Sequence, residues 1–133
     1  MPLRGQLLFI RPIAETDWAA VAEFLKEEAP DCRPPHVGLV AKLVGDLVAV
    51  AGTSTDGDDV TLEMVVVAKA LRRKRIGRFL VDALASSAAG PRPRWLVARK
   101  EESTLAFFRR VGFSDRGDSI VRQIESEMKQ VGP

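Results

Sequence analysis

The stretch from Met64 to Leu80 constrains the fold of this 133-residue chain most strongly. It opens with four apolar residues, three of them β-branched valines, which is typical of a buried strand. A basic segment with one glycine follows, and from Ile76 onward apolar residues recur at helical spacing. The pattern therefore predicts a strand, a basic loop and the start of a helix, in that order.

Such a junction is suited to binding an anion. The first N–H groups of a helix have no acceptor within the helix, and the helix dipole adds partial positive charge there. Six of the ten residues from 69 to 78 are Lys or Arg. Cations oppose the dipole at this end of a helix, so a bound polyanion would turn repulsion into attraction. A solvated basic first turn is the alternative, and we favour a phosphate site.

The same residues resemble a family motif. The segment Arg72-Arg73-Lys74-Arg75-Ile76-Gly77 is similar to the Q/R-x-x-G-x-G/A signature of the GNAT superfamily of acyl-CoA-dependent N-acetyltransferases. Arg72 and Gly77 fit this signature, and Arg75 stands where its first glycine usually is. In the family, the loop and helix start hold the cofactor pyrophosphate, and the preceding strand bonds the pantetheine arm. The resemblance implies an acetyl-CoA site at Val65, Val66, Val67, Arg72, Arg73, Lys74, Arg75, Ile76, Gly77 and Arg78.

Two further segments extend this resemblance over about residues 7–124. Phe107 to Phe113 is similar to the F-Y-x-x-x-G-F segment of the GNAT fold, at the expected distance from the basic loop. The opening Ile10-Arg11-Pro12, with Thr16-Asp17, resembles the start of many members. The resemblance implies that the cofactor site also includes Ser103, Phe107 and Phe108.

The chain departs from the family pattern at the general acid. It contains no tyrosine, and Phe108 stands where the family has the tyrosine thought to protonate the departing thiolate. Phenylalanine has no proton to donate, so Ser103, Thr104 or a water would act instead. Alternatively no acid is needed, because a thiol with a pKa of about 8.5 leaves as thiolate near neutral pH.

Glu63 is the candidate general base. It precedes Val65 by two residues, in a strand whose apolar neighbours would favour its taking a proton through a water. A solvated glutamate on a half-exposed strand is the alternative.

The remaining pattern predicts an α/β fold with a single-domain, mixed, mostly antiparallel sheet and flanking helices, as in the GNAT fold. The sheet would contain a parallel pair, because strands 60–67 and 94–98 are joined through a helix ending near 88–91. Trp18 and Trp95 are expected in the core, and Thr16 or Asp17 as the cap of the first helix. The other predicted elements are a strand at 7–12, a helix at 18–28 with Trp18, Val21, Ala22 and Leu25 on its apolar face, a hairpin of 37–44 and 47–52 turning at Gly45, a turn at Asp56-Gly57, a helix at 103–111 and a strand at 120–125.

The GNAT pattern is shortened at its second helix, where only the loop Pro30–His36 stands. Its three prolines and short length exclude a stable helix. We therefore expect an open acceptor side with Arg33 and His36 as substrate-binding residues near its rim. Such a rim suits a peptide end or an extended amine, and Arg33 favours an acceptor that carries an acid beside its amine.

Composition bounds the remaining possibilities. The 46% hydrophobic and 29% charged content describes a soluble globular protein, for which we predict one domain with a core of about residues 6–125. Cys32 is the only cysteine, which excludes an internal disulfide and indicates a reducing compartment. The absence of a long apolar run or a signal-like start then favours the cytoplasm without membrane contact. Cys32 and His36 could form a nucleophilic pair, but two soft ligands cannot close a metal site, so no metal is expected.

The leading interpretation is an N-acetyltransferase that transfers an acetyl group from acetyl-CoA to a primary amine of a small molecule or peptide, by direct attack. The missing tyrosine motivates an alternative, an acyl-CoA sensor of the same fold without turnover. A nucleic-acid protein using the basic loop is a third possibility, disfavoured because no aromatic residues interleave the charges. A homodimer is compatible with each.

Overall fold

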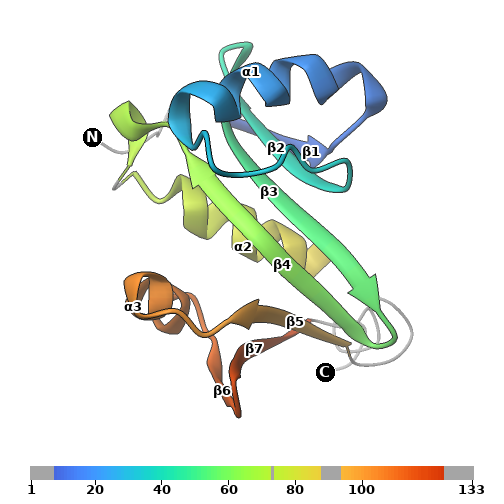
Figure 1. The fold of residues 1–133 in the computed structure, drawn as a ribbon, viewed down its shortest axis with the longest axis vertical. Helices are drawn as coiled ribbons and strands as arrows, with labels where there is room; N and C mark the ends of the chain where they lie inside the picture. Colours follow the sequence, from blue (N-terminus) through green and yellow to red (C-terminus); the bar gives the residue numbers. More distant parts are fainter. Residues whose placement is uncertain (1–7, 73, 88–93, 125–133) are drawn as a thin grey trace, which may run out of the picture. The chain divides into compact units, whose positions relative to one another are not determined.

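The computed structural model describes residues 8–72, 74–87 and 94–124. These residues form a seven-stranded sheet in the order β1-β2-β3-β4-β5-β7-β6, together with three α-helices (Figure 1). The predicted α/β class with a mixed, mostly antiparallel sheet is confirmed. The elements are β1 Leu8–Pro12, α1 Trp18–Glu28, β2 Gly38–Leu43, β3 Asp46–Asp56, β4 Asp59–Val67, α2 Ile76–Ser87, β5 Arg94–Arg99, α3 Glu102–Arg110, β6 Ser114–Arg116 and β7 Ser119–Ile124.

The chain divides into two compact units, each described by itself. The first unit contains the described residues through Thr53 together with Met64–Leu80. The second contains Ser54–Glu63 and the described residues from Val81 onward. Because β3, β4 and α2 each contribute to both units, the units are not successive segments of the sequence. The predicted domain limits stay a prediction.

The core of the first unit lies between α1 and the sheet. Val21 and Leu25 are spaced four residues apart on one face of α1 and are fully buried. They pack against Val40 of β2, Val50 of β3 and Val66 of β4. Figure 1 shows α1 lying across these strands. The predicted helix at 18–28 is therefore confirmed with its boundaries.

Other expectations for α1 are wrong. Ala22 is exposed, and Trp18 retains 38% of its surface exposed instead of entering the core. An aromatic ring can remain at the surface because burying one edge removes much of its apolar area from water. Thr16 and Asp17 also make no side-chain cap, although Asp17 is the residue that precedes the helix.

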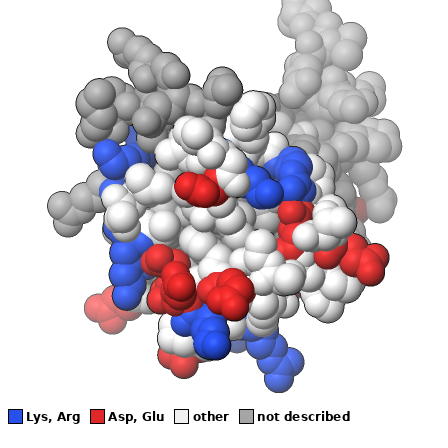
Figure 2. All heavy atoms as spheres, turned by 90° about the horizontal axis from the view of Figure 1, so that it is seen from above, with Lys and Arg blue, Asp and Glu red and all other residues white. Residues whose placement is uncertain are grey.

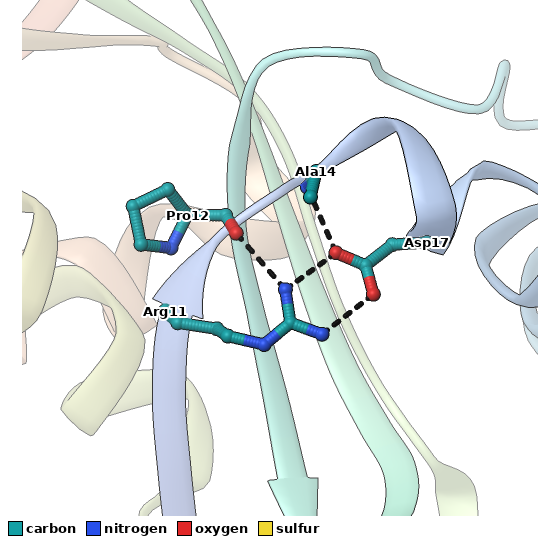
Figure 3. Close-up of polar contacts among 4 residues, drawn as sticks. All are labelled: Arg11, Pro12, Ala14 and Asp17. Carbon is teal, nitrogen blue, oxygen red and sulfur yellow. Dashed lines mark hydrogen bonds and ion pairs between the residues drawn. The ribbon is translucent and has the colours of Figure 1, made fainter.

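Asp17 instead accepts a bidentate ion pair from Arg11 of β1 (Figure 3). The Nη1–Oδ2 and Nη2–Oδ1 distances are 2.5 Å and 2.6 Å, and the Ala14 N–H donates to Oδ2 at 2.8 Å. A bidentate guanidinium–carboxylate contact pairs two opposite charges through two hydrogen bonds, whereas a cap bond joins the carboxylate to one neutral N–H group. These contacts, that from Arg11 most of all, lower the pKa of Asp17 to about 2. The R-P…D segment thus holds the corner between β1 and α1.

Tight turns connect β2 to β3 and β3 to β4, as predicted. Leu43 pairs with Asp46, which leaves a two-residue turn of Val44 and Gly45 with φ of 51° and 86°. Two positive φ values define a type I′ turn, which is common in hairpins but disfavours a β-branched residue. Gly57 turns the next hairpin at φ 62°. β3 extends beyond its predicted end at Gly52, through polar residues that lack an apolar pattern.

In the second unit, β5 pairs in parallel with β4 from Asp59↔Trp95 to Leu62↔Ala98. Its other edge pairs antiparallel with β7. The predicted parallel pair is confirmed. β6 was not predicted, because its three exposed polar residues carry no strand pattern. Trp95 is 37% exposed, so its core assignment is wrong for the same reason as that of Trp18.

The third helix also matches its prediction closely. α3 ends at Arg110, and Gly112 follows at φ 96°, a conformation that favours glycine. Arg122 of β7 closes this end by donating to the Val111 carbonyl at 3.0 Å and to Asp82 at 2.7 Å. The predicted helix terminator at 88–91 lies outside the described residues.

Candidate functional site

The end of the predicted strand, the basic loop and the start of the predicted helix all belong to the first unit. β4 ends at Val67, the 3-10 turn η2 spans Lys69–Leu71, and α2 begins at Ile76. Ile76 and Leu80 are 1% and 0% exposed, so one face of α2 is anchored in the core from its first residue. Its first backbone N–H groups have no acceptor within the helix, which is the arrangement that binds phosphate.

Arg75 has the backbone conformation that a glycine would have. Its φ is 66°, and its carbonyl accepts the first helical bond, from the Phe79 N–H at 3.0 Å. For a residue with a Cβ, this left-handed conformation costs roughly 1–2 kcal/mol. Arg75 stands at the position of the signature's first glycine, and it adopts a conformation that glycine would adopt without strain. Gly77 is the second residue of α2 and is half-buried.

Two contacts fix the backbone where the loop leaves the sheet. The Lys69 N–H donates to Glu28 Oε1 at 2.9 Å, which ties η2 to the last residue of α1. Arg72 Nε donates to the Val67 carbonyl at 3.3 Å. Sequence reasoning missed Glu28, since nothing in a local pattern links residues 41 positions apart. Arg73 lies outside the described residues, Lys74 is half-buried, and Arg78 is exposed.

The end of β4 presents two different faces. Val66 is 8% exposed and packs in the core beneath α1, while Val65 and Val67 alternate to the opposite face and are half-buried. Among the described residues, the ladder with β5 ends at Leu62, and β4 continues to Val67. Peptide groups of Val65–Val67 therefore lie beyond the ladder.

Glu63 shares the face of Val65 and Val67 by strand alternation. Its side chain is exposed, so the apolar surroundings expected for it are not found. The alternation that buries Leu62 is what turns Glu63 outward.

The other predicted cofactor residues belong to the second unit. Ser103 is exposed in the first turn of α3, and Phe107 is half-buried. Phe108 is 9% exposed, and its ring lies 5.3 Å from Phe107 and 4.9 Å from Phe113. The ring of Phe108 is therefore a structural part of this unit's core.

The loop before β2 contains no helix in residues 29–37, as predicted, yet it is held at several points. The His36 ring stacks on Trp18 at 4.1 Å with 20° between the planes. Pro35 covers Gly52, where an added Cβ would stand 2.8 Å from the Pro35 Cβ. Arg33 and His36 are exposed, whereas Cys32 is half-buried against the core. Cys32 and His36 thus have different partners, which argues against a nucleophilic pair.

Three further observations concern surface charge, metal ligands and membrane-spanning helices. On the face shown in Figure 2, basic and acidic side chains are interspersed instead of forming one basic surface. Within the described ranges, no three His, Cys, Asp or Glu side chains are placed to hold a metal ion. No helix in that part of the chain is long and apolar enough to cross a membrane.

The structure is that of a mixed α/β protein in which a basic loop and the start of a helix follow a central strand. The sequence profile of the acetyltransferase (GNAT) domain matches residues 34–115, which is more than half of the chain. The chain belongs to the GNAT acetyltransferase family. No curated protein matches it significantly in sequence.

Solved structures share this fold at low sequence identity. The ribosomal-protein-S18-alanine N-acetyltransferase of Escherichia coli is 18% identical, with a TM-score of 0.67 over 96% of this chain and 100% of its own. N-acetylglutamate synthase of Neisseria gonorrhoeae, in complex with coenzyme A and L-arginine, is 15% identical with a TM-score of 0.71, over 89% of this chain and 33% of its own. Diaminobutyrate acetyltransferase EctA of Paenibacillus lautus, bound to its substrate and coenzyme A, is 13% identical with a TM-score of 0.63, over 90% and 95%.

Proposed function

We propose that the protein transfers an acetyl group from acetyl-CoA to a primary amine. The observation that carries this is the left-handed backbone of Arg75 before α2, a conformation that glycine favours, at the position of the signature's first glycine. Two of the similar structures contain coenzyme A, which supports the same ligand here.

In this proposal the basic loop and the first turn of α2 hold the phosphates of the cosubstrate. Arg72, Arg73, Lys74, Arg75 and Arg78 supply positive charge, while Ile76 and Gly77 offer backbone N–H groups. Ser103 and Phe107 are included among the cosubstrate contacts on the family resemblance of their segment alone. The peptide groups of Val65–Val67 beyond the ladder would bond the pantetheine arm and polarise the thioester carbonyl.

The reaction is direct attack by the amine. Its nitrogen forms the C–N bond to the thioester carbon, the C–S bond breaks, and the sulfur leaves with its electron pair as the CoA thiolate. The amine loses one proton, which Glu63 accepts through a water. Solvent exposure of Glu63 gives such a water direct access. Phe108 cannot protonate the thiolate, and the exposed Ser103 hydroxyl or a water is the candidate donor.

The acceptor is proposed to be an extended amine or peptide end with an acidic group beside it. Arg33 is exposed in a loop without a covering helix, and His36 stands on Trp18 in the same loop. A cytoplasmic location and a homodimer belong to the same proposal.

Measurements of coenzyme A binding test whether the basic loop and the start of α2 hold the cosubstrate. CoA should raise the melting temperature, and less so at high salt. Gly77→Val should weaken CoA binding more than it lowers stability, because a β-branched side chain crowds the approach of the phosphates. Ser86→Val, at an exposed position later in α2, is the matched control and should leave CoA affinity unchanged. Equal CoA affinity of Gly77→Val and the parent would remove the basis of the proposal.

Glu63→Gln tests the chemistry. Turnover should fall about a hundredfold while CoA affinity stays intact, since glutamine cannot accept the proton. The deficit should shrink at higher pH, where the amine is already deprotonated. Parent-like turnover at pH 7 would instead indicate that a water chain or the substrate is the base.

A sensor that binds acyl-CoA without turnover is the second candidate, favoured by the absence of tyrosine. Free thiol release with a panel of amines separates the two functions. Release with free amino acids or short acidic peptides supports the enzyme, and tight binding without release supports the sensor. A preference for polyamines would contradict the proposed acceptor.

A further inference from the structure

Arg75 combines a strained backbone with an uncommitted charge. Its φ of 66° is unfavourable for any residue with a Cβ, whereas a glycine would have it without strain. Its side chain is exposed. Within the described ranges, no protein group forms a hydrogen bond or ion pair with its guanidinium. Therefore no side-chain contact of Arg75 within the described part of the protein offsets the cost of its backbone conformation.

The described cations closest to Arg75 in the sequence, Arg72, Lys74 and Arg78, differ from it in this respect. Arg72 directs its Nε to the Val67 carbonyl, and Lys74 and Arg78 make other contacts within the protein. Arg75 also precedes the first residue of α2, so its side chain starts at the edge of the proposed phosphate site. Among the described cations of residues 72–78, its side chain is the one without a hydrogen bond or ion pair to the described part of the protein, and it is available to an external anion.

Coenzyme A carries more negative charge than the backbone N–H groups at the start of α2 can bind. The backbone N–H groups of α2 match the pyrophosphate of coenzyme A. Coenzyme A also carries a 3′-phosphate on its ribose, a monoester close to a dianion at neutral pH. Residues 69–78 contain six cations and no acidic residue, so this segment can neutralise both groups. A guanidinium fork fits a terminal phosphate bidentately.

We propose that Arg75 binds the 3′-phosphate of the cosubstrate and makes the protein discriminate coenzyme A from 3′-dephospho-coenzyme A. The inference rests on the proposed function and deepens it. Arginine in place of the family's glycine is strained at this φ, but its side chain gives selectivity for the ribose that carries the 3′-phosphate.

Isothermal titration with the two ligands tests this on the parent protein and three variants. Arg75→Gly removes both charge and strain, whereas Arg75→Gln removes the charge and keeps the strain. Arg110→Gln removes an exposed charge from α3 as the control. The parent should bind CoA about tenfold more tightly than dephospho-CoA, the size of effect that one charge-assisted contact provides. Both Arg75 variants should lose most of this preference through weaker CoA binding alone, and Arg110→Gln should retain it.

Melting temperatures without ligand supply an independent readout. Arg75→Gly should melt higher than Arg75→Gln, since both remove a charge that opposes the helix dipole and only glycine also relieves the strain. Equal binding of both ligands by the parent would overturn the inference, as would equal weakening of both by the variants, which would assign Arg75 to the pyrophosphate. If the parent binds neither ligand, the proposed function itself fails.

Discussion

Replacing Asp17 by asparagine should remove a measurable share of the stability of this protein above pH 4. The side chain of Asp17 is 6% exposed, and its pKa is lowered from 3.8 to about 2 by the bidentate contact with Arg11 and the Ala14 N–H. A shift of this size corresponds to about 2 kcal/mol of folding free energy at pH 7. Because Arg11 is 42% exposed, solvent screening makes this an upper value.

The sign follows from the direction of the shift. The folded protein holds the Asp17 proton less tightly than the unfolded chain, so the contribution is complete above pH 4. It is lost as the pH falls through about 2. Urea unfolding of the parent and of Asp17→Asn from pH 7 downward should show free energies of unfolding that differ by up to about 2 kcal/mol, and this difference should narrow below pH 4. At pH 7 it corresponds to a difference of up to about 7 °C in melting temperature for a chain of this length.

Asp115→Asn is the matched control. Asp115 also pairs with arginine, Arg109 at 3.2 Å, but both side chains are 53% exposed. Exposed pairs contribute little to stability, so this variant should unfold nearly as the parent does. A gap for Asp17→Asn that equals that of Asp115→Asn, or that stays constant from pH 7 to pH 3, would refute the reasoning.

Three further substitutions test the turns and the packing. Val44→Asn should stabilise by about 1 kcal/mol in thermal unfolding, because asparagine tolerates the φ of 51° that strains valine; an unchanged melting temperature would count against this turn geometry. Gly52→Ala should destabilise by about 1–3 kcal/mol and alter acceptor rates without altering CoA affinity, since its Cβ would displace Pro35; parent-like stability would contradict that contact. Arg122→Met should lose about 1–2 kcal/mol in urea unfolding by leaving the Val111 carbonyl without its donor, and a neutral effect would show that water replaces the guanidinium.

Local sequence patterns predicted most of the elements in this fold. Apolar periodicity located α1 at its observed boundaries, and glycine and aspartate located the turns at Gly45 and Gly57. These features depend on residues within about four positions of each other, so the pattern and its cause lie in the same stretch. β6 escaped prediction because its pairing partner, not its own composition, makes it a strand.

The candidate site was predictable in position but not in detail. The motif at 72–77 located the phosphate loop, since a helix start after a buried strand has an intrinsic preference for anions. That Arg75 adopts the glycine conformation, and that Glu28 holds Lys69, could not be read from the motif. Both depend on how the loop is held by the sheet and by α1.

The sequence by itself therefore determined the order of elements, the turns and the place of the basic loop, because these follow from short-range propensities. The tertiary structure decided which side chains are buried and paired. It left Trp18 at the surface against His36, and it directed Asp17 to Arg11 instead of the helix end. The physical reason is that a polar side chain can bond to any of several partners, and only the folded chain brings the partner that binds it most strongly within reach.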